Sequence, residues 1–381
     1  MRAERFIADR LRFKGKLAAV AVAVSFFVMI ISLAIAGGFR REIRQSISGI
    51  SGDVMLTTGE EPMSSHPACY ERLEAVPGVA EVTPVIWKPG IVQGEGDICG
   101  VLVKGIPMPD SCSLQASIPA RLAKRMKLEE GDAMTTWFVE GKAKARRFRI
   151  SDIYEGVTDS GDAPVILVPL SDMQRVCEWT PEQAGALEVR LKPRFSEGAM
   201  LAAKADELNL ASILGREDED EDILRASTSR QRYPQLFDWL DLIDFNVLAI
   251  LLLMTVVAGF NMISGLLILL FRNISTIGML KSMGMGNNGI AKVFLRVSAR
   301  LVLVGMAVGN AAALLFCLLQ GTTHLIKLNP ANYFVSYVPV HVNWGLIVLV
   351  DILAFAAIML LLLIPTLFIS KVDPAETVRV K

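Results

Sequence analysis

Four long, nearly uncharged blocks limit what this chain can fold into. They begin at Leu17, Phe245, Leu301 and Trp344. Each is long enough to cross the hydrocarbon core of a membrane as a helix, which takes roughly 20 apolar residues. A cleaved signal peptide would explain only the first block, which is longer than the apolar core of such a peptide. The sequence therefore predicts four membrane-spanning helices.

The spans divide the chain into membrane and water-exposed parts. The predicted fold class is an α-helical membrane protein with four transmembrane helices plus a large mixed α/β extracytoplasmic domain between the first and second helices. The expected segments are a cytoplasmic amphipathic N-terminal segment (1–16), transmembrane helix 1 (17–38), an outer α/β domain with a stalk (39–240), transmembrane helix 2 (243–271), a cytoplasmic link (272–292), transmembrane helix 3 (293–320), a short outer loop (321–343), transmembrane helix 4 (344–369) and a cytoplasmic tail (370–381).

The distribution of Lys and Arg predicts the orientation of the spans. Short flanking segments rich in these residues stay in the cytoplasm. Residues 1–16 contain six basic and two acidic residues, and the stretch 272–300 contains basic residues and no acidic one. We therefore expect both termini in the cytoplasm. Acidic residues outnumber basic ones in 39–240, although three arginines just after the first span run against the rule.

The outer domain has enough residues for a substantial core, or for two subdomains. Alternating apolar runs bounded by turn residues predict strands at 82–87, 100–105, 134–139, 148–154, 165–168 and 187–191. Helical periodicity predicts helices at 67–75, 119–127, 171–178 and 196–208, and a stalk over 230–244 that continues into the second span. The acidic run Glu217–Asp222 is expected to be a solvated loop.

Signatures of catalysis and metal binding are weak. His66, His324 and His341 are too far apart in sequence for a zinc-binding spacing. Residues 284–289 match a dinucleotide-binding glycine pattern, but they follow a membrane span and lack the strand that the motif needs. The sequence has no P-loop, so we expect ATP to be used by another polypeptide. The five cysteines include no CxxC pair, and we expect free thiols.

The link between the second and third spans carries the most informative pattern. Ile274, Ile277, Met279 and Leu280 form an apolar group close to Lys281. A short amphipathic helix with these residues could dock in a groove on a partner protein. A simple inner loop is the alternative.

This link resembles a known family of membrane permeases. Residues 276–284 (TIGMLKSMG) resemble the coupling helix of the LolC/LolE and MacB/FtsX permeases of ABC transporters. Residues 119–176 resemble the outer domain of this family, and 372–379 (VDPAETVR) its closing signature. The usual acid before the coupling core is replaced by Asn273 and Ser275, so an acidic contact to the ATPase is not implied.

The resemblance implies a role and a set of partners. The chain would be a non-catalytic permease subunit in a bacterial inner membrane, paired with a second permease, the same or homologous, and with an ATPase dimer that uses ATP and Mg²⁺. It would bind no cofactor and no nucleic acid, and would contact membrane lipid and a lipoprotein cargo. The residues implied in ATPase coupling are Ile274, Ile277, Met279, Leu280, Lys281, Met283 and Gly284.

Three functions fit such a permease. The first choice is ATP-driven extraction of lipoproteins from the outer leaflet, by mechanotransmission to the periplasmic domain. The alternatives are a MacB-like exporter of peptides or small molecules and an FtsX-like regulator of periplasmic cell-wall hydrolases.

Polar and small residues inside the spans are further candidates. Gly305 and Gly309 form a small-xxx-small face, for packing within the chain or against a second permease. Asp351 is a rare acid within a span, suited to a polar-cavity or snorkelling role, or to cargo binding or gating. Asn261 is a polar candidate in the second span, and Pro365 is expected to kink the fourth.

Overall fold

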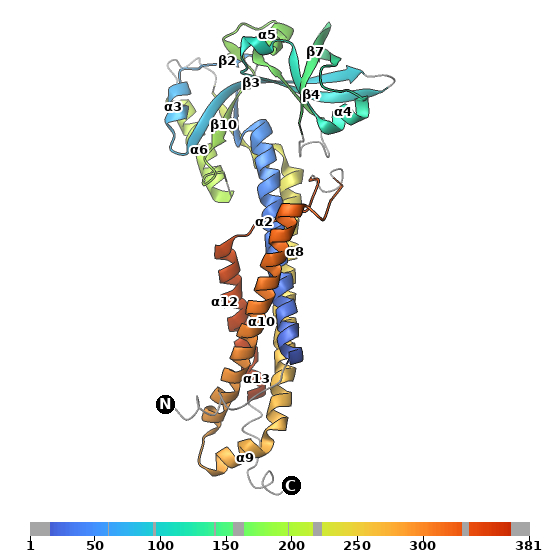
Figure 1. The fold of residues 1–381 in the computed structure, drawn as a ribbon. Helices are drawn as coiled ribbons and strands as arrows, with labels where there is room; N and C mark the ends of the chain where they lie inside the picture. The colour runs from blue at the N-terminus through green and yellow to red at the C-terminus, as the bar shows by residue number, and fades with distance from the viewer. Residues whose placement is uncertain are drawn as a thin grey trace. The chain divides into compact units, whose positions relative to one another are not determined.

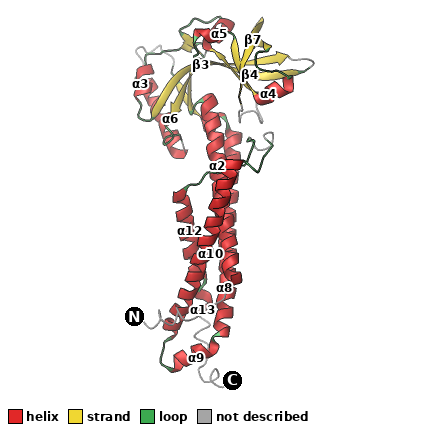
Figure 2. Cartoon of the chain, viewed as in Figure 1, coloured by secondary structure: helices red, strands yellow, loops and turns green. Residues whose placement is uncertain are grey.

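The computed structural model describes residues 16–59, 61–93, 97–140, 142–154, 164–196, 198–215, 223–329 and 335–366. The predicted N-terminal segment, the acidic run at 217–222 and the tail signature at 372–379 lie outside these residues, apart from Lys16. The chain forms two compact units. We call them the helical unit (1–41, 239–327 and 337–381) and the α/β unit (42–238 and 328–336). Figures 1 and 2 show that all strands belong to the α/β unit.

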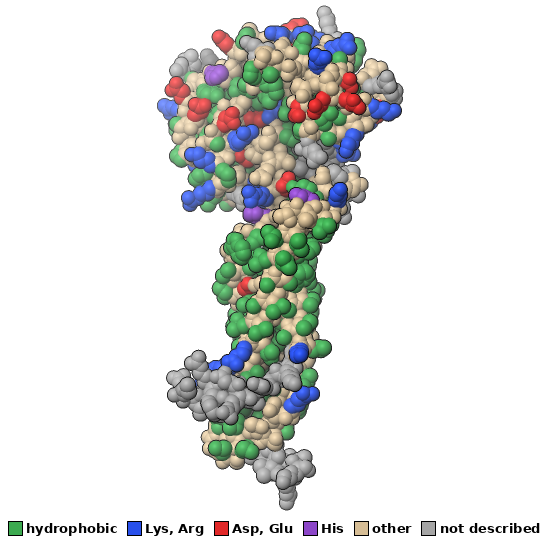
Figure 3. Space-filling model, in the orientation of Figure 1, with side chains coloured by type: hydrophobic (Ala, Val, Ile, Leu, Met, Phe, Trp, Pro, Cys, Tyr) green, Lys and Arg blue, Asp and Glu red, His purple; other side chains and the backbone are tan. Residues whose placement is uncertain are grey.

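Among the described residues, the helical unit contains four helices long and apolar enough to cross a membrane. Hydrophobic side chains cover its visible face, and Lys and Arg side chains gather toward the end that carries α9 (Figure 3). This distribution is the one expected for a bundle surrounded by lipid. The helices of this unit, some of which continue into the other unit, are α2 (Lys16–Ser51), α8 (Pro234–Arg272), α9 (Ile274–Ser282), α10 (Asn287–Thr323), α12 (Trp344–Leu361) and α13 (Leu363–Thr366).

The bundle core joins all four spans. Phe26 of α2, Met262 of α8, Phe294 of α10 and Ile358 of α12 are buried in one hydrophobic cluster. The first helix does not end at residue 38, where the predicted span ends, but continues to Ser51. Within this helix, position 38 must be a glycine, because a Cβ there would lie only 2.2 Å from the Pro339 carbonyl oxygen.

The fourth span is interrupted near its C-terminal end, where Pro365 was expected to kink it. α12 ends at Leu361 and the short α13 follows after Leu362. Proline has no N–H to donate to the carbonyl four residues earlier, and its ring clashes with that carbonyl. The carbonyl in question is that of Leu361, where α12 ends.

The α/β unit is built on one long sheet, and β2 and β9 pair as a separate two-stranded sheet. The strand order of the long sheet is β11-β1-β10-β3-β4-β8-β5-β7-β6, and β6 also pairs with β3. The strands from β3 to β6 therefore close into a barrel. The strands are β1 (Val54–Thr57), β2 (Met63–Ser64), β3 (Val79–Gln93), β4 (Ile98–Ile106), β5 (Gln115–Pro119), β6 (Ala133–Glu140), β7 (Lys142–Tyr154), β8 (Val165–Pro169), β9 (Gln183–Ala184), β10 (Ala186–Leu191) and β11 (Arg225–Thr228).

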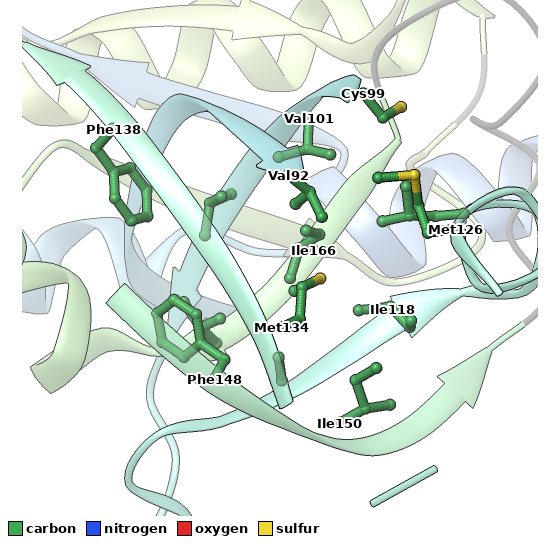
Figure 4. Close-up of a cluster of buried hydrophobic side chains, with 14 of the residues drawn as sticks. Val92, Cys99, Val101, Ile118, Met126, Met134, Phe138, Phe148, Ile150 and Ile166 are labelled. Atoms are coloured by element: carbon green, nitrogen blue, oxygen red, sulfur yellow. The ribbon is translucent and has the colours of Figure 1, made fainter. Parts of the chain in front are cut away.

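Two hydrophobic cores lie on either side of the shared strand β3. Val92, Phe138, Phe148 and Ile166 of the barrel strands are buried in one cluster with Met126 of α4 (Figure 4), and residues of α5 belong to the same cluster. The open part of the sheet packs against α3 and α6. The helices of this unit are α3 (Tyr70–Ala75), α4 (Ala120–Met126), α5 (Leu170–Cys177), α6 (Gly198–Leu214) and α7 (Ser229–Arg232), with a 3₁₀ turn at Asp110–Cys112.

The predicted stalk is wrong at its start. Residues 229–232 form the separate helix α7, whose capping box joins Thr228 and Gln231. α8 begins only at Pro234, which suits the first turn of a helix because its missing N–H has no partner there. No disulfide joins the five cysteines in the structure, which all lie among the described residues.

Candidate functional site

The link between the second and third spans is a helical hairpin turn built around α9. Asn273 separates α8 from α9, and its Nδ2 donates a hydrogen bond to the Leu269 carbonyl (2.8 Å). Its backbone N–H also bonds to the carbonyls of Leu269 and Leu270. Asn273 therefore stabilises the bend by satisfying carbonyl groups at the end of α8.

A Schellman motif ends α9 at the predicted residue Gly284. The Met285 N–H donates to the Leu280 carbonyl and the Gly284 N–H to the Lys281 carbonyl, both at 2.9 Å. Gly284 has a φ of +89°, which only glycine adopts without strain. Leu280 and Met285 both pack against the bundle core, as the motif usually requires. The glycine pattern at 284–289 thus belongs to a helix end and the following turn.

The structure divides the predicted coupling residues into two faces. Ile277 is 1% exposed and Leu280 packs beside it against the bundle core. Ile274, Met279 and Met283 are instead 38%, 60% and 78% exposed. The expectation that Ile277 and Leu280 belong to an outward apolar group is therefore wrong, because these two residues attach α9 to its own bundle. We call Ile274, Met279 and Met283 the outer face of α9.

Gly305 and Gly309 lie where α10 crosses α2 of the same chain. A Cβ at Gly309 would be 2.4 Å from the Ala23 carbonyl oxygen, and one at Gly305 would be 2.8 Å from Val22 Cγ1. Small residues let two helix backbones approach closely, which drives association where lipid is the solvent. These glycines therefore pack within the chain.

The two polar candidates, Asp351 and Asn261, lie on different helices of the bundle. Asp351 lies on α12, where its Oδ2 accepts a hydrogen bond from Asn310 Nδ2 of α10 (2.6 Å). Asn261 is half-buried on α8. The structure does not bring Asn261 and Asp351 together through any described hydrogen bond.

A polar cluster, which the sequence did not suggest, holds the C-terminal end of α2 within the α/β unit. Lys104 of β4 is 4% exposed, and its Nζ donates to the Ile50 carbonyl (2.5 Å) and to Glu188 Oε2 (2.6 Å). Trp87 Nε1 donates to the other oxygen of Glu188 (2.9 Å). A cation at a helix C-terminus also interacts favourably with the helix dipole. We call this group the α2 anchor.

The anchor continues through Asp53 and Arg232. Asp53 Oδ2 accepts the Leu191 N–H (2.8 Å), and Arg232 Nη2 donates to the Gly52 carbonyl (3.0 Å). Burial lowers the pKa of Lys104, and the nearby Glu188 carboxylate opposes that shift. Burial raises the pKa of Asp53, although the Leu191 N–H and nearby cations oppose the shift. The end of α2 is thus fixed by charge-assisted bonds to two strands and a helix.

The sequence carried only a faint signal of this anchor. Lys104 follows a run of apolar residues in a strand, and Glu188 does the same in another. A charge at an inward position of a predicted strand requires a partner, because buried charges are paired. The pattern could have predicted that each has a partner, but not that the two residues meet.

A family model agrees with the architecture of the helical unit. The model for the "FtsX-like permease C-terminal" domain matches residues 248–374, which include α9, α10 and α12. Residues 248–374 thus resemble the C-terminal domain of FtsX-like permeases. The described residues form four candidate membrane helices, with a mixed α/β domain between the first and second.

Similar proteins extend the match to nearly the whole chain. The LolC protein of a lipoprotein-releasing system from Neisseria meningitidis serogroup B is 22% identical, over 94% of this chain and 92% of that protein. The LolE protein from Haemophilus influenzae is 20% identical, over 95% of this chain and 93% of that protein. Both are described as transmembrane proteins of lipoprotein-releasing systems.

Solved structures give a weaker likeness. The periplasmic region of MacB from Actinobacillus actinomycetemcomitans matches 51% of this chain and 97% of that structure, with 13% identity and a TM-score of 0.32. The extracellular domain of the transporter YknZ from Gram-positive bacteria matches 46% of this chain and 99% of that structure, with 10% identity and a TM-score of 0.32.

Proposed function

We propose that this chain is the permease subunit of an ATP-driven lipoprotein-releasing system. The observation that carries the proposal is the near-complete alignment with LolC and LolE, across both the spans and the α/β domain. The cargo would be a lipoprotein taken from the outer leaflet of the inner membrane. ATP and Mg²⁺ would be used by a separate ATPase dimer, and a second permease, identical or homologous, would complete the assembly.

The orientation follows from charge. The basic stretch 272–300, which contains no acidic residue, would lie in the cytoplasm with both termini. The α/β unit would then be periplasmic. This orientation would put α9 on the cytoplasmic side, where an ATPase could bind it.

The outer face of α9 supports its role as the ATPase contact. Ile274, Met279 and Met283 are apolar and exposed, although they lie in a link that carries basic residues and no acidic one. Methionine side chains adapt their shape to a binding groove, which suits a docking helix. Ile277 and Leu280 would transmit the movement of this helix to the bundle because they are packed into it.

Movement would reach the α/β unit along α2 and α8. The boundary between the units falls inside both helices, after Arg41 in α2 and before Trp239 in α8. Within the helical unit these helices contact each other through Phe39 and Trp239, whose ring centroids are 5.6 Å apart, and through an Arg40–Asp244 ion pair. At its far end α2 is held by the α2 anchor.

The test is co-purification of the tagged full-length chain from its native membrane. Met279→Asp combined with Met283→Asp should abolish association with an ATPase and the release of acylated proteins, while the permease stays folded. Met200→Asp is the matched control, since Met200 is an exposed methionine of α6. If wild-type protein brings down no ATPase and no acylated protein, the proposed function is wrong. If the Met279/Met283 variant binds the ATPase as well as wild type, α9 is not the contact.

A further inference from the structure

Two polar side chains meet among spans that are otherwise free of charge. Asn310 of α10 donates from Nδ2 to Asp351 Oδ2 of α12 (2.6 Å). Asp351 is seven residues after Trp344, which places it about 10 Å from the start of the helix. It is the only Asp, Glu, Lys or Arg in the four apolar blocks, taken as 17–36, 245–271, 301–323 and 344–366.

The bond leaves one oxygen without a partner on each side chain. Asn310 Oδ1 and Asp351 Oδ1 are both shielded, and neither has a hydrogen bond among the described residues. Both atoms are acceptors when the carboxyl group is ionised, so they cannot satisfy each other in that state. Unsatisfied polar atoms are costly in a membrane, where no water replaces the missing donor.

We propose that Asp351 and Asn310 together form a proton-binding site within the membrane. A proton taken from water converts the carboxylate to a carboxylic acid, with the O–H on Asp351 Oδ1. This O–H donates to Asn310 Oδ1, while Asn310 Nδ2 keeps its bond to Asp351 Oδ2. One proton thus satisfies both orphaned oxygens and closes a ring of two hydrogen bonds between α10 and α12.

The other ligands that could satisfy these oxygens fit less well. No described Lys or Arg forms an ion pair with Asp351, and the apolar blocks supply none. Calcium needs six to eight oxygen ligands and magnesium an octahedral set, whereas the pair offers two free oxygens. The proton is the one cation for which two oxygens are a complete site.

The consequence is a neutral clasp between the third and fourth spans. An acid–amide pair carries no net charge, so α12 faces lipid without an ionised group. The clasp does not depend on the proposed function, because it concerns only contacts within the helical unit.

Substitutions distinguish a neutral pair from an ionised one. In Asp351→Asn two amides can form the same ring, each donating one N–H and accepting one. The full-length chain in lipid nanodiscs should therefore keep its unfolding midpoint with Asp351→Asn. Asp351→Leu and Asn310→Leu should each lower that midpoint by about 2–5 °C, since each removes the interhelical bonds.

Infrared spectroscopy at pH 7 tests the proton itself. The difference between wild type and Asp351→Asn should contain the carbonyl stretch of a protonated carboxyl, which a carboxylate lacks. Asp97→Asn is the control: this acid is exposed, and the hydrogen bond from Arg125 lowers its pKa, so its difference spectrum should show a carboxylate. Absence of the protonated band for Asp351, or an Asp351→Asn variant as unstable as Asp351→Leu, would overturn the proposal.

Discussion

The two units of this protein hold one and the same helix, α2, by opposite means. Within the helical unit, α2 packs closely against Gly305 and Gly309 of α10, where a Cβ on either glycine would clash with atoms of α2. At its C-terminal end, within the α/β unit, α2 is held by Lys104, Asp53 and Arg232 through hydrogen bonds. The first contact depends on shape and the second on charge.

The difference follows from the solvent around each region. In lipid, apolar burial gives little net attraction between helices, so close packing must provide it. In water, a helix end must satisfy its last carbonyl groups, and a paired lysine does so while its charge is compensated by Glu188. Three substitutions test this comparison.

The largest effect is expected for Lys104→Met. Removing the cation leaves Glu188 buried without its ion partner and the Ile50 carbonyl without its donor, which should cost about 3–5 kcal/mol. Thermal unfolding of the full chain, followed by Trp fluorescence, measures the loss. Arg190→Met is the control, because the Arg190–Glu81 pair is exposed and worth about 0–1 kcal/mol. Equal losses of stability in the two variants would show that the α2 anchor contributes no more than an exposed ion pair.

Gly309→Ala should have an intermediate effect. Its Cβ would lie 2.4 Å from the Ala23 carbonyl, so α10 and α2 must move apart. Overpacking of this kind costs about 1–3 kcal/mol, measurable as a lower unfolding midpoint in nanodiscs. Gly321→Ala on the same helix is the matched control, since its Cβ would meet only an ordinary contact at 3.6 Å. If both variants are equally stable, shape does not hold α2 in the bundle.

The smallest effect is expected for Asp53→Asn, and it depends on pH. Burial raises the native-state pKa of Asp53 above 3.8, so the folded protein holds this proton more tightly than the unfolded chain. The associated stability is present at low pH and is lost as pH rises through the native pKa. Asparagine keeps an acceptor for the Leu191 N–H but cannot ionise. The unfolding midpoint of the variant, relative to that of wild type, should therefore be higher at pH 7 than at pH 4. If this difference is the same at both pH values, the expectation is wrong.

The spans were predictable from sequence because their signal is long and local. All six predicted strands and four predicted outer helices also occur in the structure, with changed ends. The strand predicted over 82–87, which already contains Pro84, extends to 79–93 and so also includes Pro89. Proline often ends a strand, yet both residues lie within β3, with Pro84 opposite Leu187 of β10 and Pro89 opposite Leu102 of β4.

Other features depend on contacts between distant residues. β1, β5 and β11 were missed because each has only four or five residues and little alternation. The pairing of β3 with β6, which closes the barrel, leaves no mark in the local pattern. At the candidate site, the apolar residues of α9 were visible in sequence, but the direction of each was not. Ile277 and Met279 are both apolar, and only the position of the bundle decides which one is buried.

Strand β3 has a consequence for how the α/β unit comes apart. Its first half pairs with β10 in the open part of the sheet, and its second half pairs with β4 and β6 in the barrel. Because β3 is one continuous strand, breaking its pairing with β10 also strains its pairing with β4 and β6, and the reverse. The two halves should therefore behave as a single cooperative unit, with their slowest backbone amides exchanging hydrogen through one common opening rather than two.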